Sequence, residues 1–81
     1  MMEKKLVSAV ALTVRHFRKM FDMSQECLAE RSGLDRTYIS GIERGVRNIT
    51  LDSLDSIIRA LNVSTSEFLS IVIKNTKSID D

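Results

Sequence analysis

The chain has 81 residues, a formal net charge of +1 and a single cysteine. A chain of this length builds only a modest core, and a lone cysteine excludes an internal disulfide, so association with a second copy is the remaining common source of stability. No apolar run approaches the roughly 20 residues of a membrane span, and no signal peptide is evident. We therefore expect one soluble, cytoplasmic domain over residues 1–81 with no membrane partner.

The charges are unevenly distributed along the chain. Residues 15–47 hold seven basic and five acidic groups, whereas residues 48–81 hold three basic and five acidic groups. A mildly basic middle suits contact with phosphate through one face of the molecule. The near-neutral total, taken alone, argues against a binder that depends mainly on electrostatic attraction to nucleic acid.

Apolar residues recur at helical spacing throughout, and proline is absent, so we expect an all-α fold of five short helices. The first helix is predicted over residues 4–21. Its inward stripe consists of Val7, Val10, Val14, Phe17 and Phe21. Asp22 follows it, and aspartate tolerates the left-handed conformation that a chain needs to leave a helix.

The second helix is predicted over residues 24–32, with Ser24 as its N-cap and Gly33 at its end. Leu28 and Ala29 face inward. Gln25 lies at the N-terminus of this helix, where its side chain and the free backbone amides could together hold a phosphate.

The third predicted helix, over residues 36–44, has Asp35 as its N-cap and Gly45 just after its end. Ile39 and Ile42 share one face and anchor it. The other faces carry side chains that can hydrogen-bond base edges and phosphates, namely Arg36, Thr37, Tyr38, Ser40 and Arg44. An ordinary solvated amphipathic helix has the same pattern, so this stretch alone leaves both interpretations open. Arg47 and Asn48 lie in the following loop, within reach of a nucleic-acid backbone or groove.

The fourth helix is predicted over residues 51–61, between Thr50 as N-cap and Asn62 as a left-handed cap. The fifth helix opens with Ser64 and Glu67, which form a capping box in which each satisfies a backbone amide of the other. We expect residues 75–81 to form a frayed polar tail.

The fifth helix carries more apolar surface than one-sided packing needs. We expect this surface to form a dimer interface of Val63, Phe68, Leu69, Val72 and Ile73. The alternative is that all five side chains pack inside the monomer.

The sequence lacks the motifs that are typical of enzyme active sites. The sequence has no glycine-rich phosphate loop, zinc-ligand cluster or serine elbow. His16 lies on the polar side of the first helix without an activated nucleophile near it. Cys27 has no second cysteine or suitable histidine as a partner, and we expect it to be inert. We predict no enzyme, no catalytic residue, no cofactor and no metal site.

Two motifs together resemble a known family. Ser24-Gln25-Glu26-x-Leu28-Ala29-x-x-Ser32-Gly33-Leu34, followed by Tyr38-Ile39-Ser40-x-Ile42-Glu43-Arg44-Gly45, resembles the helix-turn-helix of the Cro/cI-like (xenobiotic-response-element, XRE) DNA-binding family, here over about residues 24–44. The run from Leu34 to Asn48 most closely resembles the controller proteins of restriction-modification systems. One departure is Asp22, where the family usually has glycine.

The resemblance implies a compact five-helix domain and a role for each matching position. The third helix would enter the major groove of double-stranded DNA, with base contacts from Arg36, Thr37, Tyr38 and Ser40. The DNA backbone would be contacted by Ser24, Gln25, Arg44, Arg47 and Asn48. Arg18 and Glu43 match a family ion pair that links the first and third helices, so their implied role is structural.

The resemblance also implies a homodimer that uses its C-terminal helices and reads a pseudo-palindromic operator. Controllers of this kind act as activator and repressor of their own gene and the endonuclease gene. Activation would require contact with RNA polymerase, for which the acidic Asp52 and Asp55 are candidates. Alternative functions are a phage-type repressor, an antitoxin, or a protein-interaction module built on the same fold.

Overall fold

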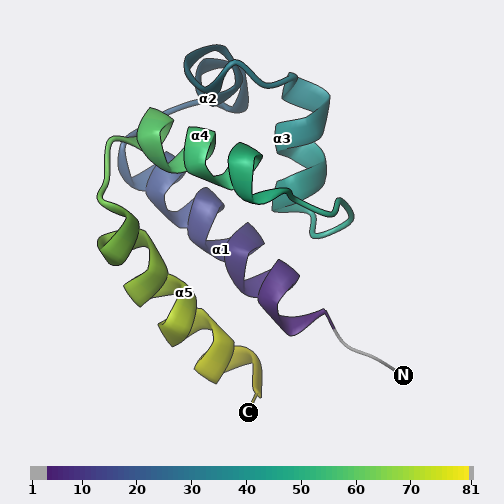
Figure 1. Ribbon diagram of the computed structural model, residues 1–81, viewed down its shortest axis with the longest axis vertical. Helices are drawn as coiled ribbons and strands as arrows, with labels where there is room; N and C mark the ends of the chain where they lie inside the picture. The colour runs from purple at the N-terminus through teal and green to yellow at the C-terminus, as the bar shows by residue number, and fades with distance from the viewer. Residues whose placement is uncertain (1–3, 81) are drawn as a thin grey trace.

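The computed structural model describes residues 4–80, which form five helices and no strand. The helices are α1 (Lys5–Met20), α2 (Gln25–Ser32), α3 (Arg36–Glu43), α4 (Leu51–Leu61) and α5 (Thr65–Asp80). Helix α5 lies along α1, α3 and α4 contact another side of α1, and α2 packs on α3 and α4 (Figure 1). The expected all-α, five-helix fold is confirmed. Within the described residues no single helix is long and apolar enough to cross a membrane; α4 and α5 meet that test only as a pair, and a bend of 108° separates them.

Local sequence signals set most helix boundaries. Gly33 ends α2 with a φ of 74°, and Asn62 ends α4 with a φ of 61°. Asp22 has a φ of 56°, so it adopts the left-handed conformation expected after the first helix. Three predicted N-caps accept a 3.0 Å hydrogen bond from a backbone amide of the following helix: Ser24 from Cys27, Thr50 from Ser53, and Ser64 from Glu67.

Asp35 departs from this pattern. It occupies the N-cap position of α3 with extended backbone angles, and its carbonyl accepts from the Ile39 amide at 3.0 Å. Its carboxylate, however, accepts no capping hydrogen bond from the described residues. The predicted side-chain cap was wrong, because this exposed carboxylate stays in water instead of turning onto the helix.

The core is built around two stacked aromatic rings, Phe17 of α1 and Phe68 of α5, whose centroids are 5.9 Å apart. Val14, Leu28, Ile39 and Ile57 are also fully buried in the same cluster. Phe21 differs from the prediction, because its side chain is 45% exposed. It lies just after the last residue of α1 and stacks on Phe17 at the rim of the core.

Helix α5 corrects two predictions. Phe68 and Val72 were assigned to a dimer interface, but they are buried in the monomer core because α5 packs along α1. The predicted tail is helical as far as Asp80. Its Asn75 amide donates to the buried Thr13 hydroxyl of α1 at 2.9 Å, and Ile79 packs against the core. These two contacts hold the last turns of α5 on α1; Asp81 lies outside the described residues.

Candidate nucleic-acid interface

Helices α2 and α3 are joined by a tight turn at one end of the molecule (Figure 1). The Leu34 amide closes the turn by donating to the Ala29 carbonyl at 3.1 Å, and the Leu34 side chain packs against the core. Ile39 and Ile42 are buried and fix α3 by its inner face. Arg36 and Thr37 are therefore left exposed at the N-terminal end of α3.

A buried polar network holds α3 in this orientation. Arg18 of α1 pairs with Glu43 of α3 through two hydrogen bonds, Nε to Oε2 at 2.6 Å and Nη2 to Oε1 at 2.9 Å. The two side chains are only 12% and 4% exposed. Hydrogen bonding to Glu43, more than its charge, raises the pKa of Arg18 against the lowering effect of burial. The predicted ion pair is present and links α1 to α3.

The same network also includes residues at the start of α2. Arg18 Nη1 donates to the Met23 carbonyl at 2.8 Å, and Gln25 Nε2 donates to Glu43 Oε1 at 3.1 Å. Gln25 was predicted only as a contact to the DNA backbone. Its amide group is in fact shared with the buried carboxylate, so it links the N-terminus of α2 to α3. This contact could not be read from the sequence, because the two residues are 18 positions apart.

A shallow depression brings the start of α2 next to the start of α3. It is lined by Arg18, Ser24, Gln25, Glu26 and Arg36. The positive end of the α2 dipole and the Arg36 guanidinium both favour an anion here. The carboxylate of Glu26, which lines the same depression, has the opposite effect on an anion.

The remaining predicted contacts differ in exposure. Arg44, Arg47 and Asn48 are exposed, whereas Ser40 is half-buried. Arg44 Nε donates to the Ser40 carbonyl of its own helix at 3.3 Å, so its guanidinium runs along the end of α3. Tyr38 is half-buried and packs against the core. The structure thus places Arg36 and Thr37 in the first turn of α3, and Arg44, Arg47 and Asn48 at and after its last turn. Asn48 also lines an apolar groove on another face.

Gly41 is a site residue that the sequence reasoning missed. It is buried in α3, and a Cβ atom built on it would lie 2.5 Å from Cγ of Arg47. The Arg47 guanidinium carbon lies 5.5 Å from the centre of the Tyr38 ring. The available signal was a glycine inside a helix at a position that needs no left-handed conformation, which indicates close packing of another group.

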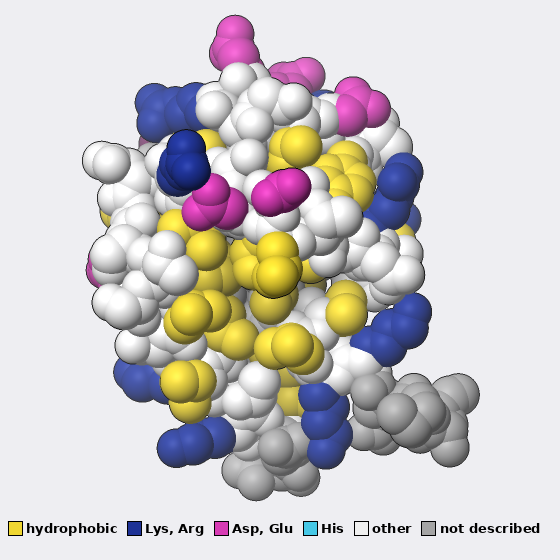
Figure 2. All heavy atoms as spheres, viewed as in Figure 1, with side chains coloured by type: hydrophobic (Ala, Val, Ile, Leu, Met, Phe, Trp, Pro, Cys, Tyr) yellow, Lys and Arg dark blue, Asp and Glu magenta, His cyan; other side chains and the backbone are white. Residues whose placement is uncertain are grey.

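An apolar groove lies on another face, between α4, α5 and the first turns of α1 (Figure 2). Its lining includes Leu6, Val7, Leu51, Leu54 and Leu69. Figure 2 shows apolar side chains gathered over this region, with basic side chains along its lower edge. Of the five predicted dimer residues, Leu69 and Ile73 are 43% and 55% exposed, and Val63 is half-buried. Leu51, which is 84% exposed, was missed.

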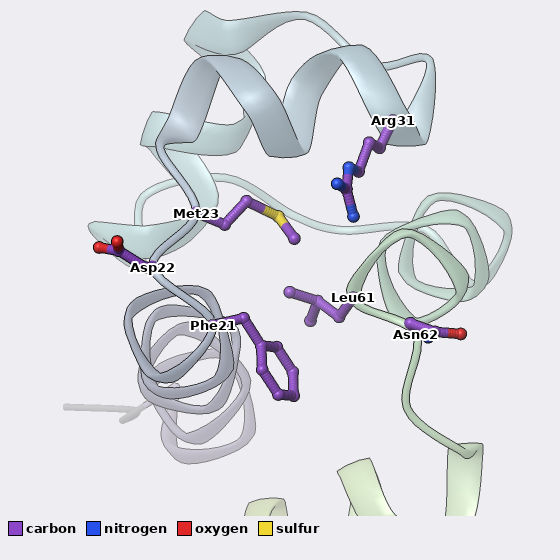
Figure 3. Close-up of a pocket in the computed structure, with 6 residues that line it drawn as sticks. All are labelled: Phe21, Asp22, Met23, Arg31, Leu61 and Asn62. Atoms are coloured by element: carbon purple, nitrogen blue, oxygen red, sulfur yellow. The ribbon is translucent and has the colours of Figure 1, made fainter.

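A second hollow lies where the ends of α1, α2 and α4 meet (Figure 3). Phe21, Met23 and Leu61 point toward one another in it, whereas Asp22 and Asn62 point away. None of its lining residues belongs to the predicted sites. Among the described residues, no group of three or more His, Cys, Asp or Glu side chains could hold a metal ion.

Comparison with known proteins agrees with this geometry. Residues 14–68 match the family model described as helix-turn-helix. The control protein C.SmaI of Serratia marcescens is 48% identical over 61 residues, which cover 75% of this chain and 73% of that protein. The control protein C.BamHI of Bacillus amyloliquefaciens is 52% identical over 48 residues, and the match covers 59% of each chain.

A solved structure extends the comparison over nearly the whole chain. The crystal structure of the restriction-modification controller protein C.Esp1396I, a tetramer in complex with its natural 35 base-pair operator, matches with a TM-score of 0.88 and 46% identity. The match covers 91% of this chain and 97% of that one. The chain therefore belongs to the Cro/cI-like (XRE-type) helix-turn-helix family, among the controller proteins of restriction-modification systems.

Proposed function

We propose that this protein is a sequence-specific DNA-binding regulator of transcription, the controller of a restriction-modification system. It activates and represses its own gene and the endonuclease gene, and it acts in the cytoplasm, where that DNA is. One observation carries the proposal: α3 leaves its N-terminal end exposed and is joined to α1 at its last residue by the buried Arg18–Glu43 pair. A reading element needs such support, because base recognition depends on side chains that are already in position.

In the proposed complex α3 enters the major groove. Arg36 donates two hydrogen bonds to a guanine, and Thr37 contacts the neighbouring base edge. Ser24, Gln25, Arg44 and Asn48 contact phosphates, which supplies affinity but carries no sequence information. The exposure of these side chains, except the half-buried Gln25, supports this division of roles.

The proposed assembly is a homodimer that closes over the apolar groove. Leu51, Leu69 and Ile73 are too exposed to serve the core of the monomer. Leu51 and Leu69 line one groove together with Leu6 and Leu54. A two-fold interface buries the same surface on both copies. The two α3 helices then meet a pseudo-palindromic operator with half-sites about 34 Å apart.

The test is binding to the DNA immediately upstream of the protein's own gene, measured with and without excess random DNA. Tight binding that survives the random competitor is the expected result. Equal affinity for both DNAs would contradict the proposal and favour a protein-interaction module. Neighbouring genes for a methyltransferase and an endonuclease would support the controller role, whereas a neighbouring toxin gene would support an antitoxin.

Arg36→Ala tests direct readout at this site. Loss of a bidentate contact to guanine should weaken binding by about 1–3 kcal/mol, and mainly on the upstream DNA. Arg44→Ala is the matched control, because loss of a phosphate contact should weaken binding to both DNAs by a similar factor. An unchanged preference in Arg36→Ala would assign the reading to another side chain.

A further inference from the structure

We infer that Tyr38 and Gly41 form a seat for Arg47, and that Tyr38 acts in DNA binding mainly as a positioning residue whose ring holds that arginine. The inference rests on the proposed function and assigns Tyr38 a role other than base contact. It also gives Gly41 a role, since this glycine leaves the gap that the arginine side chain fills.

The path of the loop after α3 brings Arg47 back over the helix. Gly45 has a φ of 73°, a left-handed conformation that turns the chain. The Val46 amide then donates to the Gly41 carbonyl at 3.0 Å, which fixes the loop against α3. The next residue, Arg47, lies with its Cγ at the position that a Gly41 side chain would occupy.

The seat has two parts on one face of α3. Tyr38 and Gly41 are three positions apart, so they are neighbours on the helix surface. Gly41 leaves a gap for the aliphatic part of Arg47, and the guanidinium carbon reaches 5.5 Å from the Tyr38 ring centre. A guanidinium at this distance over an aromatic ring is attracted to it. The Tyr38 ring itself is fixed because it packs against the core.

This arrangement prepares Arg47 for a phosphate or a groove. A free arginine side chain loses rotamer freedom when it binds, and that loss weakens the complex. Contact with Tyr38 and Gly41 restricts the rotamers of Arg47 before DNA binds. The ring of Tyr38, and not its hydroxyl, is therefore the feature that supports affinity.

A double-mutant cycle on the upstream DNA tests the inference. Tyr38→Phe keeps the ring and should bind like the wild type. Tyr38→Leu removes the ring and should weaken binding by about two- to fivefold. Tyr38→Leu combined with Arg47→Ala should bind no worse than Arg47→Ala alone, because the seat has no use without the arginine. Equal losses in Tyr38→Phe and Tyr38→Leu, or losses that multiply in the double variant, would overturn the inference.

Gly41→Ala tests the same contact without removing a side chain that packs against the core. Alanine favours helix more than glycine does, so α3 should not be weakened. The added Cβ nevertheless has to displace Arg47. DNA binding should fall about as much as in Tyr38→Leu, with an unchanged or raised melting temperature. Wild-type affinity in Gly41→Ala would count against the seat.

A measurement without DNA separates this inference from the proposed function. Tyr38 is the only tyrosine of the chain, so its ring is readily assigned by NMR. The side-chain protons of Arg47 should be shifted upfield by the ring in the wild type and in Tyr38→Phe, but not in Tyr38→Leu. Identical Arg47 shifts in all three would refute the seat. If the shifts appear while the protein does not distinguish the upstream DNA from random DNA, the proposed function fails and the seat remains.

Discussion

The helix-turn-helix end of this molecule adds a buried polar network to its apolar contacts, whereas the α1–α5 layer relies mainly on apolar packing. Arg18, Gln25 and Glu43 join three helices through directional hydrogen bonds that are largely withdrawn from water. In the α1–α5 layer, the stacked Phe17 and Phe68 rings dominate, and apolar contact has no preferred direction.

The difference explains how each region serves the proposed function. The hydrogen-bond network fixes the orientation of α3 relative to α1 and α2. Recognition of bases requires such a fixed orientation. An apolar surface only requires that a complementary surface cover it. Helix α5 buries Phe68 and Val72 in the core of the monomer and leaves Leu69 and Ile73 exposed, where the proposed dimer would cover them.

Breaking the directional network should remove a large part of the stability of the fold. Glu43→Ala leaves the Arg18 guanidinium unpaired at a site where it is only 12% exposed, so we expect a loss of about 3–5 kcal/mol in the free energy of unfolding. Urea denaturation measures this loss. The control is Asp55→Ala, which breaks the Arg59–Asp55 pair, whose side chains are 79% and 52% exposed. That exposed pair should contribute less than about 1 kcal/mol. A similar loss of unfolding free energy in both variants would contradict the proposed difference between the buried and the exposed ion pair.

Leu69→Lys should act on assembly and leave the fold intact. The charge lies on the exposed side of α5, so the protein should sediment as a folded monomer. DNA affinity should fall on the order of 100-fold, because the two half-sites no longer bind as a unit. Leu12→Lys is the control, since Leu12 is an exposed leucine that does not line the groove.

Val72→Lys tests the buried side of α5, for comparison with Leu69→Lys on its exposed side. Val72 lies in the core of the monomer, so this variant should unfold instead of dissociating. A folded monomer in Val72→Lys, or an intact dimer in Leu69→Lys, would show that the two faces of α5 are assigned incorrectly.

A smaller effect is expected at the end of α5. Asn75→Ala removes the hydrogen bond to Thr13 and should cost about 1 kcal/mol of stability. Hydrogen exchange should then be faster at residues 75–79, while α2 and α3 keep their protection. Unchanged exchange in this segment would mean that Ile79 alone holds the last turns.

The smallest predicted difference concerns two helix N-caps. Thr50 accepts a capping hydrogen bond from Ser53, so Thr50→Ala should cost about 1 kcal/mol. Asp35→Ala should lower the free energy of unfolding by only about a few tenths of a kcal/mol. The reason is that the Asp35 carboxylate makes no capping hydrogen bond among the described residues. Thermal unfolding of the two variants, compared at equal protein concentration, measures the difference. Equal losses would mean that Asp35 caps α3 in solution.

The sequence was sufficient where structure is determined locally. Ser24 and Gly33 delimit α2 through contacts within a few residues, so both ends were predictable. The helical period identified α5 as apolar, but it could not say which partner covers each side chain. Asn75 looked like part of a polar tail because its partner, Thr13, is 62 positions away. A glycine inside α3 indicates that another group packs closely there, but no local pattern indicates that Arg47 of the following loop is that group.

A hydroxyl-radical footprint on the upstream DNA tests the central claim most directly. The claim is that a dimer presents two rigid α3 helices to adjacent major grooves. The account predicts two related protected segments on one face of the duplex, with centres about one helical turn apart, and the loss of both segments together in Leu69→Lys. A single protected segment, or uniform protection that is unchanged by Leu69→Lys, would contradict it.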